Sequence, residues 1–189
     1  MLCPIRITKF VGTVSLGLLT GLSYSMATIV IPSLKALPTA ANGTRALKAV
    51  KRSSRKHALR LADLSAGCLL VAWLVAPKRA KHPYLLWVSI TSTLGAFGVD
   101  YWFNRKLGLK GWACGVLKDI DVPSLGLRKQ PSQSPKKEED LVVVEAESDV
   151  NGEMVQQDMD QERKLHSVRT WFSGVALTMA IVGLWGERS

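Results

Sequence analysis

The residues that could carry chemistry in this chain of 189 residues are few and lie far apart. The three histidines have neither metal-site nor catalytic-triad spacing, and they are His57, His82 and His166. The three cysteines share no metal or redox spacing, and they are Cys3, Cys68 and Cys114. No glycine-rich phosphate loop is present in the sequence. We therefore expect no catalytic, cofactor-binding or metal-ligating residue, and a protein that is not an enzyme.

Two acids, Asp63 and Asp100, fall inside otherwise apolar segments. An acid at the centre of a bilayer costs about 2.5–3.5 kcal/mol, and less near the interface. Both residues lie near the ends of their segments, which favours interfacial positions. The alternative is a polar path lined by both acids, as in a small transporter or channel subunit, but the sequence contains no inverted repeat to support it.

Four apolar segments must position these residues. The run Phe10–Ile31 contains 22 uncharged residues, and a helix of this length reaches about 33 Å, enough to cross a hydrocarbon core of about 30 Å. The run is longer than the apolar part of a signal peptide and continues unbroken to Pro32, so we expect it to be retained. The other segments are 58–76, 83–103 and 168–186, with aromatic residues at the ends of the last two. The sequence predicts an all-α membrane protein with about four transmembrane helices and both termini on one side.

The net charge of +10 is concentrated between the apolar segments. The loop 32–57, together with Arg60, contains no acid and eight basic residues: Lys35, Arg45, Lys48, Lys51, Arg52, Arg55, Lys56 and Arg60. This pattern indicates a flank that sets topology by the positive-inside rule. Wound as a helix, Arg45, Lys48, Arg52 and Arg55 would share a face, so an interfacial helix on an anionic membrane is the alternative. We expect no nucleic-acid binding, because aromatic residues do not interleave with the cations.

The loop 104–167 is basic at first and then acidic, and this composition predicts disorder. Ser134 precedes a proline and is a candidate phosphorylation site. Leu141, Val142, Val143 and Val144 form an apolar island among acids that could contact a partner as an added strand, the alternative being a solvated linker. Residues 168–189 then form the fourth helix and a short tail.

Small residues recur every four positions along the first apolar segment, and they are Thr13, Gly17, Gly21 and Ser25. Such a stripe lets helix backbones approach closely in lipid. It predicts helix packing, either against another helix of the same chain or in a homo-oligomer through the first helix.

Several fragments of the sequence resemble the fungal autophagy-related protein 33 family. The chain opens with Ile7-Thr8-Lys9 before Ser15-Leu16-Gly17-Leu18 and Gly21-Leu22. Its middle contains Ala76-Pro77 and then Lys81-His82-Pro83-Tyr84-Leu85-Leu86, and its last helix ends in Val182-Gly183-Leu184-Trp185-Gly186-Glu187. The order and spacing of these fragments also match. The resemblance covers both ends and the middle of the chain, but neither of the two long loops.

The resemblance implies a multi-pass protein of the mitochondrial outer membrane with a role in mitophagy, the selective autophagy of mitochondria. It implies no catalysis and no cofactor, and the family includes a paralogous branch without an established autophagy role. The resemblance implies two kinds of partner: the lipid bilayer, and autophagy or outer-membrane proteins. We expect these proteins to bind the loop 104–167. The aromatic-x-x-aliphatic pattern that ubiquitin-like modifiers bind occurs at Trp87–Ile90 and Phe172–Val175, both inside predicted spans. We therefore expect an interaction or regulatory factor that is not a direct modifier receptor.

Overall fold

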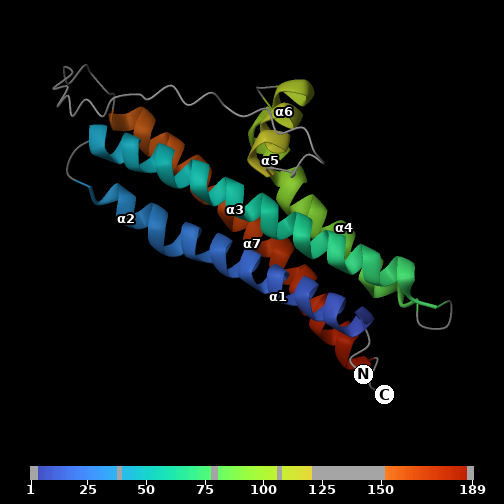
Figure 1. Cartoon of the computed structure of the whole chain (residues 1–189). Coiled ribbons are helices and arrows are strands. Elements are labelled where there is room, and N and C mark those ends of the chain that lie inside the picture. Colours follow the sequence, from blue (N-terminus) through green and yellow to red (C-terminus); the bar gives the residue numbers. More distant parts are fainter. Residues whose placement is uncertain (1–3, 38–39, 78–80, 106–107, 121–151, 187–189) are drawn as a thin grey trace, which may run out of the picture.

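The computed structural model describes residues 4–37, 40–77, 81–105, 108–120 and 152–186, and within these ranges every regular element is a helix. The chain forms long helices that run alternately up and down (Figure 1). The start of α1 and the end of α7 lie at the same end of the bundle (Figure 1). This arrangement agrees with the all-α fold class expected from the sequence.

The first rod consists of α1 (Pro4–Ser25), a π-helical segment η1 (Met26–Val30) and α2 (Ile31–Lys35). We expected the helix to end at Pro32, but it continues for another turn. Proline has no N–H and its ring clashes with the carbonyl four residues earlier. The wider π-helical turn immediately before it is one of the ways in which a helix accommodates such a disturbance.

The second rod is the uninterrupted helix α3 (Ala40–Val75). Our prediction of a loop over 32–57 was therefore wrong for its larger part, because residues 40–57 continue directly into the apolar segment 58–76. These residues are mostly alanine, leucine, lysine, arginine and serine, with no proline to stop a helix. The helix ends just before Ala76-Pro77, where proline disfavours the helical conformation of the residue in front of it.

The third rod begins where Pro83 takes the first helical position after the extended His82. It consists of α4 (Pro83–Thr93), a π-helical segment η3 (Leu94–Gly98) and α5 (Val99–Phe103). A short helix, α6 (Gly108–Ile120), follows, with Gly108 in the left-handed region at a φ of 70°. Glycine adopts this conformation without a Cβ clash.

The last helix, α7 (Gly152–Gly186), begins sixteen residues before the predicted span at Val168. The prediction of disorder over 104–167 is therefore wrong for 108–120 and 152–167, which are helical. Buried contacts stabilise the early part of α7, where Val155 and Met159 pack against Ile31 and Leu47. Residues 121–151 lie outside the described part of the chain.

Three helices among the described residues are long and apolar enough to cross a membrane: Ile5–Lys35, Asn42–Val75 and Gly152–Gly186. The predicted third span, Pro83–Phe103, is helical but is not one of them. Four hydroxyl residues, Ser89, Thr91, Ser92 and Thr93, reduce its apolar character. It nonetheless packs into the main apolar core of the bundle, to which Leu85, Val88 and Ala96 belong.

The helices α3 and α7 are longer than a bilayer requires. At about 1.5 Å per residue they reach about 54 Å and 52 Å, whereas a hydrocarbon core is about 30 Å thick. Their polar N-terminal parts, residues 40–57 and 152–167, lie beside α2 at one end of the bundle (Figure 1). We call these three segments the stalk. Its small core consists of Ile31, Leu47, Val155 and Met159, with Leu34 packed against them.

Candidate functional site

Asp100 is the centre of a buried ion-pair cluster at the base of the stalk. Its side chain accepts hydrogen bonds from Arg55 Nε at 3.1 Å and from Arg55 Nη2 at 3.0 Å. Trp112 Nε1 on α6 donates a third bond of 2.8 Å, and Asn104 Nδ2 donates to the Asp100 carbonyl oxygen at 2.9 Å. A carboxylate held by a bidentate arginine is among the stronger polar contacts in proteins. Asp100 therefore connects α3, α5 and α6.

Arg169 joins α7 to the same cluster. The residue is only 1% exposed, and its Nη2 lies 3.7 Å from Asp100 Oδ1. The same nitrogen donates a 3.5 Å hydrogen bond to the carbonyl oxygen of Ala96 in η3. Segments of π-helix depart from the regular ladder and are frequent at functional sites. A buried charge without a partner costs several kcal/mol, so this pairing fixes the position of α7.

A second ion pair, between Lys51 on α3 and Glu162 on α7, lies on the stalk side of Asp100. His166 is buried one turn further along α7, between Glu162 and Arg169. A cavity of about 10 Å³ lies among these side chains, which is room for about one water molecule. The cluster is therefore a closed structural joint, too tight to bind a solute.

An ion pair between α2 and α7 lies outside this cluster, in the described part of the stalk. Lys35 Nζ on α2 donates a 2.6 Å hydrogen bond to Asp160 Oδ1 on α7. This bond from Lys35 lowers the pKa of Asp160, so the pair stays charged at neutral pH. Together with the Lys51–Glu162 pair, it aligns the acids of α7 with cations of α2 and α3.

The two aspartates singled out in the sequence lie in different environments. Asp100 is 1% exposed and paired with arginines, which our expectation of an interfacial position did not include. Asp63 is exposed on the outer face of α3. The tight cavity beside Asp100 and the outward position of Asp63 give no support to the alternative of a solute path between them. Sequence reasoning missed Arg55 and Arg169 as partners of Asp100, because nothing in the spacing connects residues on three different helices.

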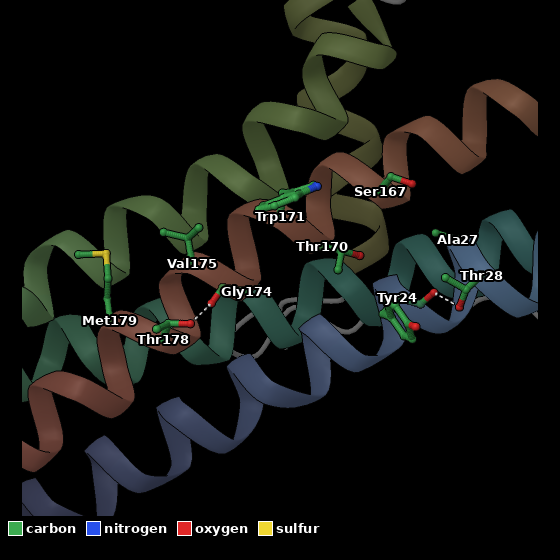
Figure 2. Close-up of a pocket in the computed structure, with 10 residues that line it drawn as sticks. All are labelled: Tyr24, Ala27, Thr28, Ser167, Thr170, Trp171, Gly174, Val175, Thr178 and Met179. Carbon is green, nitrogen blue, oxygen red and sulfur yellow. Dashed lines mark hydrogen bonds between the residues drawn. The ribbon is translucent and has the colours of Figure 1, made fainter.

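An apolar groove of about 640 Å³ runs between the first rod and α7 (Figure 2). Its walls come from α1 and η1, with Tyr24 and Thr28, and from α7, with Trp171, Gly174 and Thr178 among others (Figure 2). Its threonine hydroxyl groups donate within their own helices, as Thr28 does to the Tyr24 carbonyl oxygen at 2.8 Å. Among the residues that the structure describes, those lining the groove are all uncharged. Such a surface is compatible with lipid chains and unsuited to a charged ligand.

The predicted packing stripe of α1 lies partly inside the bundle. A Cβ added at Gly17 would lie 3.9 Å from Leu177 on α7, whereas one at Gly21 would meet nothing within 4 Å. Thr13 donates to the Lys9 carbonyl oxygen at 2.9 Å, and Ser25 is half-buried. Homo-oligomerisation through this stripe stays a prediction. Tighter glycine contacts, which we did not predict, include Gly12 against Leu69, Gly95 against Phe172 and Gly183 against Tyr84.

Two further groups of predicted site residues cannot be placed. The candidate phosphorylation site Ser134 and the candidate partner contact, Leu141, Val142, Val143 and Val144, lie outside the described residues. The aromatic-x-x-aliphatic patterns lie in α4 and α7, where Trp87 and Phe172 are helical. Strand addition requires an extended backbone, so neither pattern is presented in the form that such binding uses.

Comparisons with known proteins assign the chain to a family. The family model described as Autophagy-related protein 33 matches residues 1–187. The curated protein "Autophagy-related protein 33" of Gibberella zeae is 30% identical over 199 residues, covering 97% of this chain and 91% of that protein. No solved structure matches the chain. A helical chain that matches from one end to the other therefore belongs to the autophagy-related protein 33 family.

Proposed function

We propose that the protein is a multi-pass protein of the mitochondrial outer membrane that acts as an interaction or regulatory factor in mitophagy. The observation that carries the proposal is the family match over residues 1–187, which implies an autophagy-related role. The proposal narrows that role to mitochondria on the basis of the resemblance described above.

In this proposal the three rods and the last helix, α7, all cross the membrane. Pro83–Phe103 is less apolar than the others, but it packs between α3 and α7, and several of its hydroxyl groups donate hydrogen bonds within the bundle. Ser89, for example, donates to the Ala66 carbonyl oxygen at 3.2 Å. Neighbouring helices can accept or donate hydrogen bonds to polar groups that lipid chains cannot satisfy. The stalk then lies on one side of the membrane, and the start of α1 and the end of α7 lie on the other.

The stalk would face the cytosol, and the acidic run 138–149 precedes its helix α7 in the sequence. The positive-inside rule supports this orientation, because the basic residues of the first loop lie on the stalk side. The stalk projects about 20 Å beyond the hydrocarbon core, from the helix lengths above. A partner would therefore meet helices that project from the membrane.

The experiment that tests the proposal removes the acidic run without damaging the stalk. A deletion as far as Glu162 would also remove the buried residues Val155 and Met159, so we replace only residues 138–149 with a Gly/Ser linker of equal length. The variant should insert normally but lower the turnover of mitochondria under starvation. A linker replacing residues 121–132 is the matched control. Full turnover in the 138–149 variant would contradict the proposal.

Two smaller sets of substitutions refine the same test. Ser134→Ala should reduce turnover if a proline-directed phosphate is needed, whereas Ser132→Ala, which lacks a following proline, should not. Replacing Leu141–Val144 with serines tests the apolar island separately. Unchanged turnover in either variant would remove that residue set from the proposed contact surface.

A further inference from the structure

A stripe of three exposed cations runs along the outer face of α3 in the stalk. Arg45, Lys48 and Arg52 are separated by three and four residues, so they lie on one side of the helix within about 10 Å of its length. All three side chains are exposed. We call these three residues the basic stripe.

Two other cations of the same segment have acidic partners. Lys51 pairs with Glu162, and Arg55 pairs with Asp100, both on the inner side of α3. Within the described ranges, no acid forms an ion pair with a residue of the basic stripe. The stalk therefore neutralises its inner cations and leaves a row of positive charge on its outer surface.

We propose that the basic stripe is a docking site for an acidic peptide segment. Three like charges along two helical turns repel one another, and an acidic chain lying beside α3 would relieve this repulsion. An acidic helix with carboxylates at matching three- and four-residue spacing, or an extended acidic peptide, provides the complementary row. The inner face of α3 already uses this chemistry, because α7 contributes Glu162 to Lys51 there.

The direction of the stripe favours a peptide over a membrane surface. The stripe runs along the axis of α3, and the same helix continues into the apolar segment 58–76. If that segment crosses the bilayer, only Arg52 approaches the lipid headgroups, while Arg45 lies about 10 Å further out. A flat anionic surface would contact one end of the stripe, whereas a peptide standing beside the stalk would contact all of it.

A role in setting membrane topology does not explain why the three cations of the basic stripe lie along one face of α3. The positive-inside rule depends on the number of basic residues near a span and not on their alignment along one face. Replacing Arg45, Lys48 and Arg52 leaves five of the eight basic residues of the loop, Arg60 included, so insertion should be preserved. Binding and topology can therefore be separated by experiment.

The test uses the full chain in nanodiscs of uncharged phosphatidylcholine, titrated with a fluorescein-labelled oligoglutamate peptide. The variant R45Q/K48Q/R52Q should bind about tenfold more weakly, because three exposed ion pairs of modest strength are lost together. The control K110Q/R163Q/K164Q removes the same charge from exposed positions on α6 and α7 and should bind almost as well as the parent. Raising the ionic strength should weaken binding of the parent.

A second chain, in which a Gly/Ser linker replaces residues 138–149, removes competition from the protein's own acidic run. Tighter peptide binding by this chain would support the proposal and identify that run as a competitor for the stripe. Absence of peptide binding by both chains, or equal losses in the stripe and control variants, would overturn it. Capture of phosphatidylserine-containing vesicles by the stripe, without peptide binding, would overturn it in favour of a membrane contact.

Discussion

Arg55 on α3 holds Asp100 on α5 through hydrogen bonds of 3.1 Å from its Nε and 3.0 Å from its Nη2, at the level where the polar stalk meets the apolar bundle. Trp112 and Arg169 approach the same carboxylate from α6 and α7. One acidic side chain therefore joins four helical segments. The predictions below follow from this joint and from the close glycine contacts around it.

Loss of the Asp100 charge should destabilise the bundle. Asp100→Asn keeps the shape of the side chain but leaves Arg55 and Arg169 without their shared anion, which should cost about 3–5 kcal/mol, the range for breaking a buried ion pair. Asp63→Asn, at an exposed position on α3, should change stability by less than about 0.5 kcal/mol. Thermal unfolding in mild detergent measures both variants. Equal effects would contradict a structural role for the cluster.

The position of α6 should depend on Trp112. Trp112→Phe removes the 2.8 Å hydrogen bond to Asp100 while keeping an aromatic ring. A lost hydrogen bond to a charged group costs about 1.5–3 kcal/mol, so backbone amides of α6 should exchange with deuterium faster. The exposed Trp102 is the matched control as Trp102→Phe. Unchanged exchange in α6 would show that other contacts hold this helix.

The contact between η3 and α7 should not tolerate a methyl group. A Cβ at Gly95 would lie 2.6 Å from Phe172 Cβ, so Gly95→Ala should cost about 1–3 kcal/mol through overpacking. Gly21→Ala, where nothing lies within 4 Å, should be neutral or slightly stabilising. Detergent unfolding midpoints compare the two. A neutral Gly95→Ala variant would mean that α7 can move away from η3 at no cost.

Self-association, if it uses the first helix, should involve Gly21. A leucine at this open position fits the single chain but blocks the approach of a second backbone. Gly21→Leu should therefore reduce energy transfer between differently labelled chains in vesicles. Gly67→Leu changes an equally open position on α3 and should have no effect. Unaltered transfer in Gly21→Leu would exclude this stripe as the oligomer contact.

The sequence predicted the helical class and the approximate positions of the apolar segments, because uncharged runs such as Phe10–Ile31 are a strong local signal. It failed where helix continues beyond the apolar region. The segments 40–57 and 152–167 are polar and charged, and they are stabilised by tertiary contacts such as Leu47 with Val155. Local composition does not contain that information.

The ion-pair cluster could not be predicted from the sequence for a related reason. Asp100 was visible as an acid in an apolar segment, but its partners Arg55 and Arg169 are 45 residues earlier and 69 residues later in the chain. Only the up-and-down packing of the helices brings them together. Buried ionisable groups in membrane segments are seldom unpaired, so the residue could have prompted a search for a cation.

In the proposed orientation, the stalk faces the cytosol at the mitochondrial surface. The most direct measurement labels single cysteines in intact mitochondria with a membrane-impermeant maleimide, after Cys3, Cys68 and Cys114 are replaced by serine. Cysteines at Ser53 and Gln157, both exposed on the stalk, should react, whereas one at Leu74, near the opposite end of α3, should not. Protection of both stalk positions until the outer membrane is ruptured, or recovery of the protein in another membrane, would contradict the account.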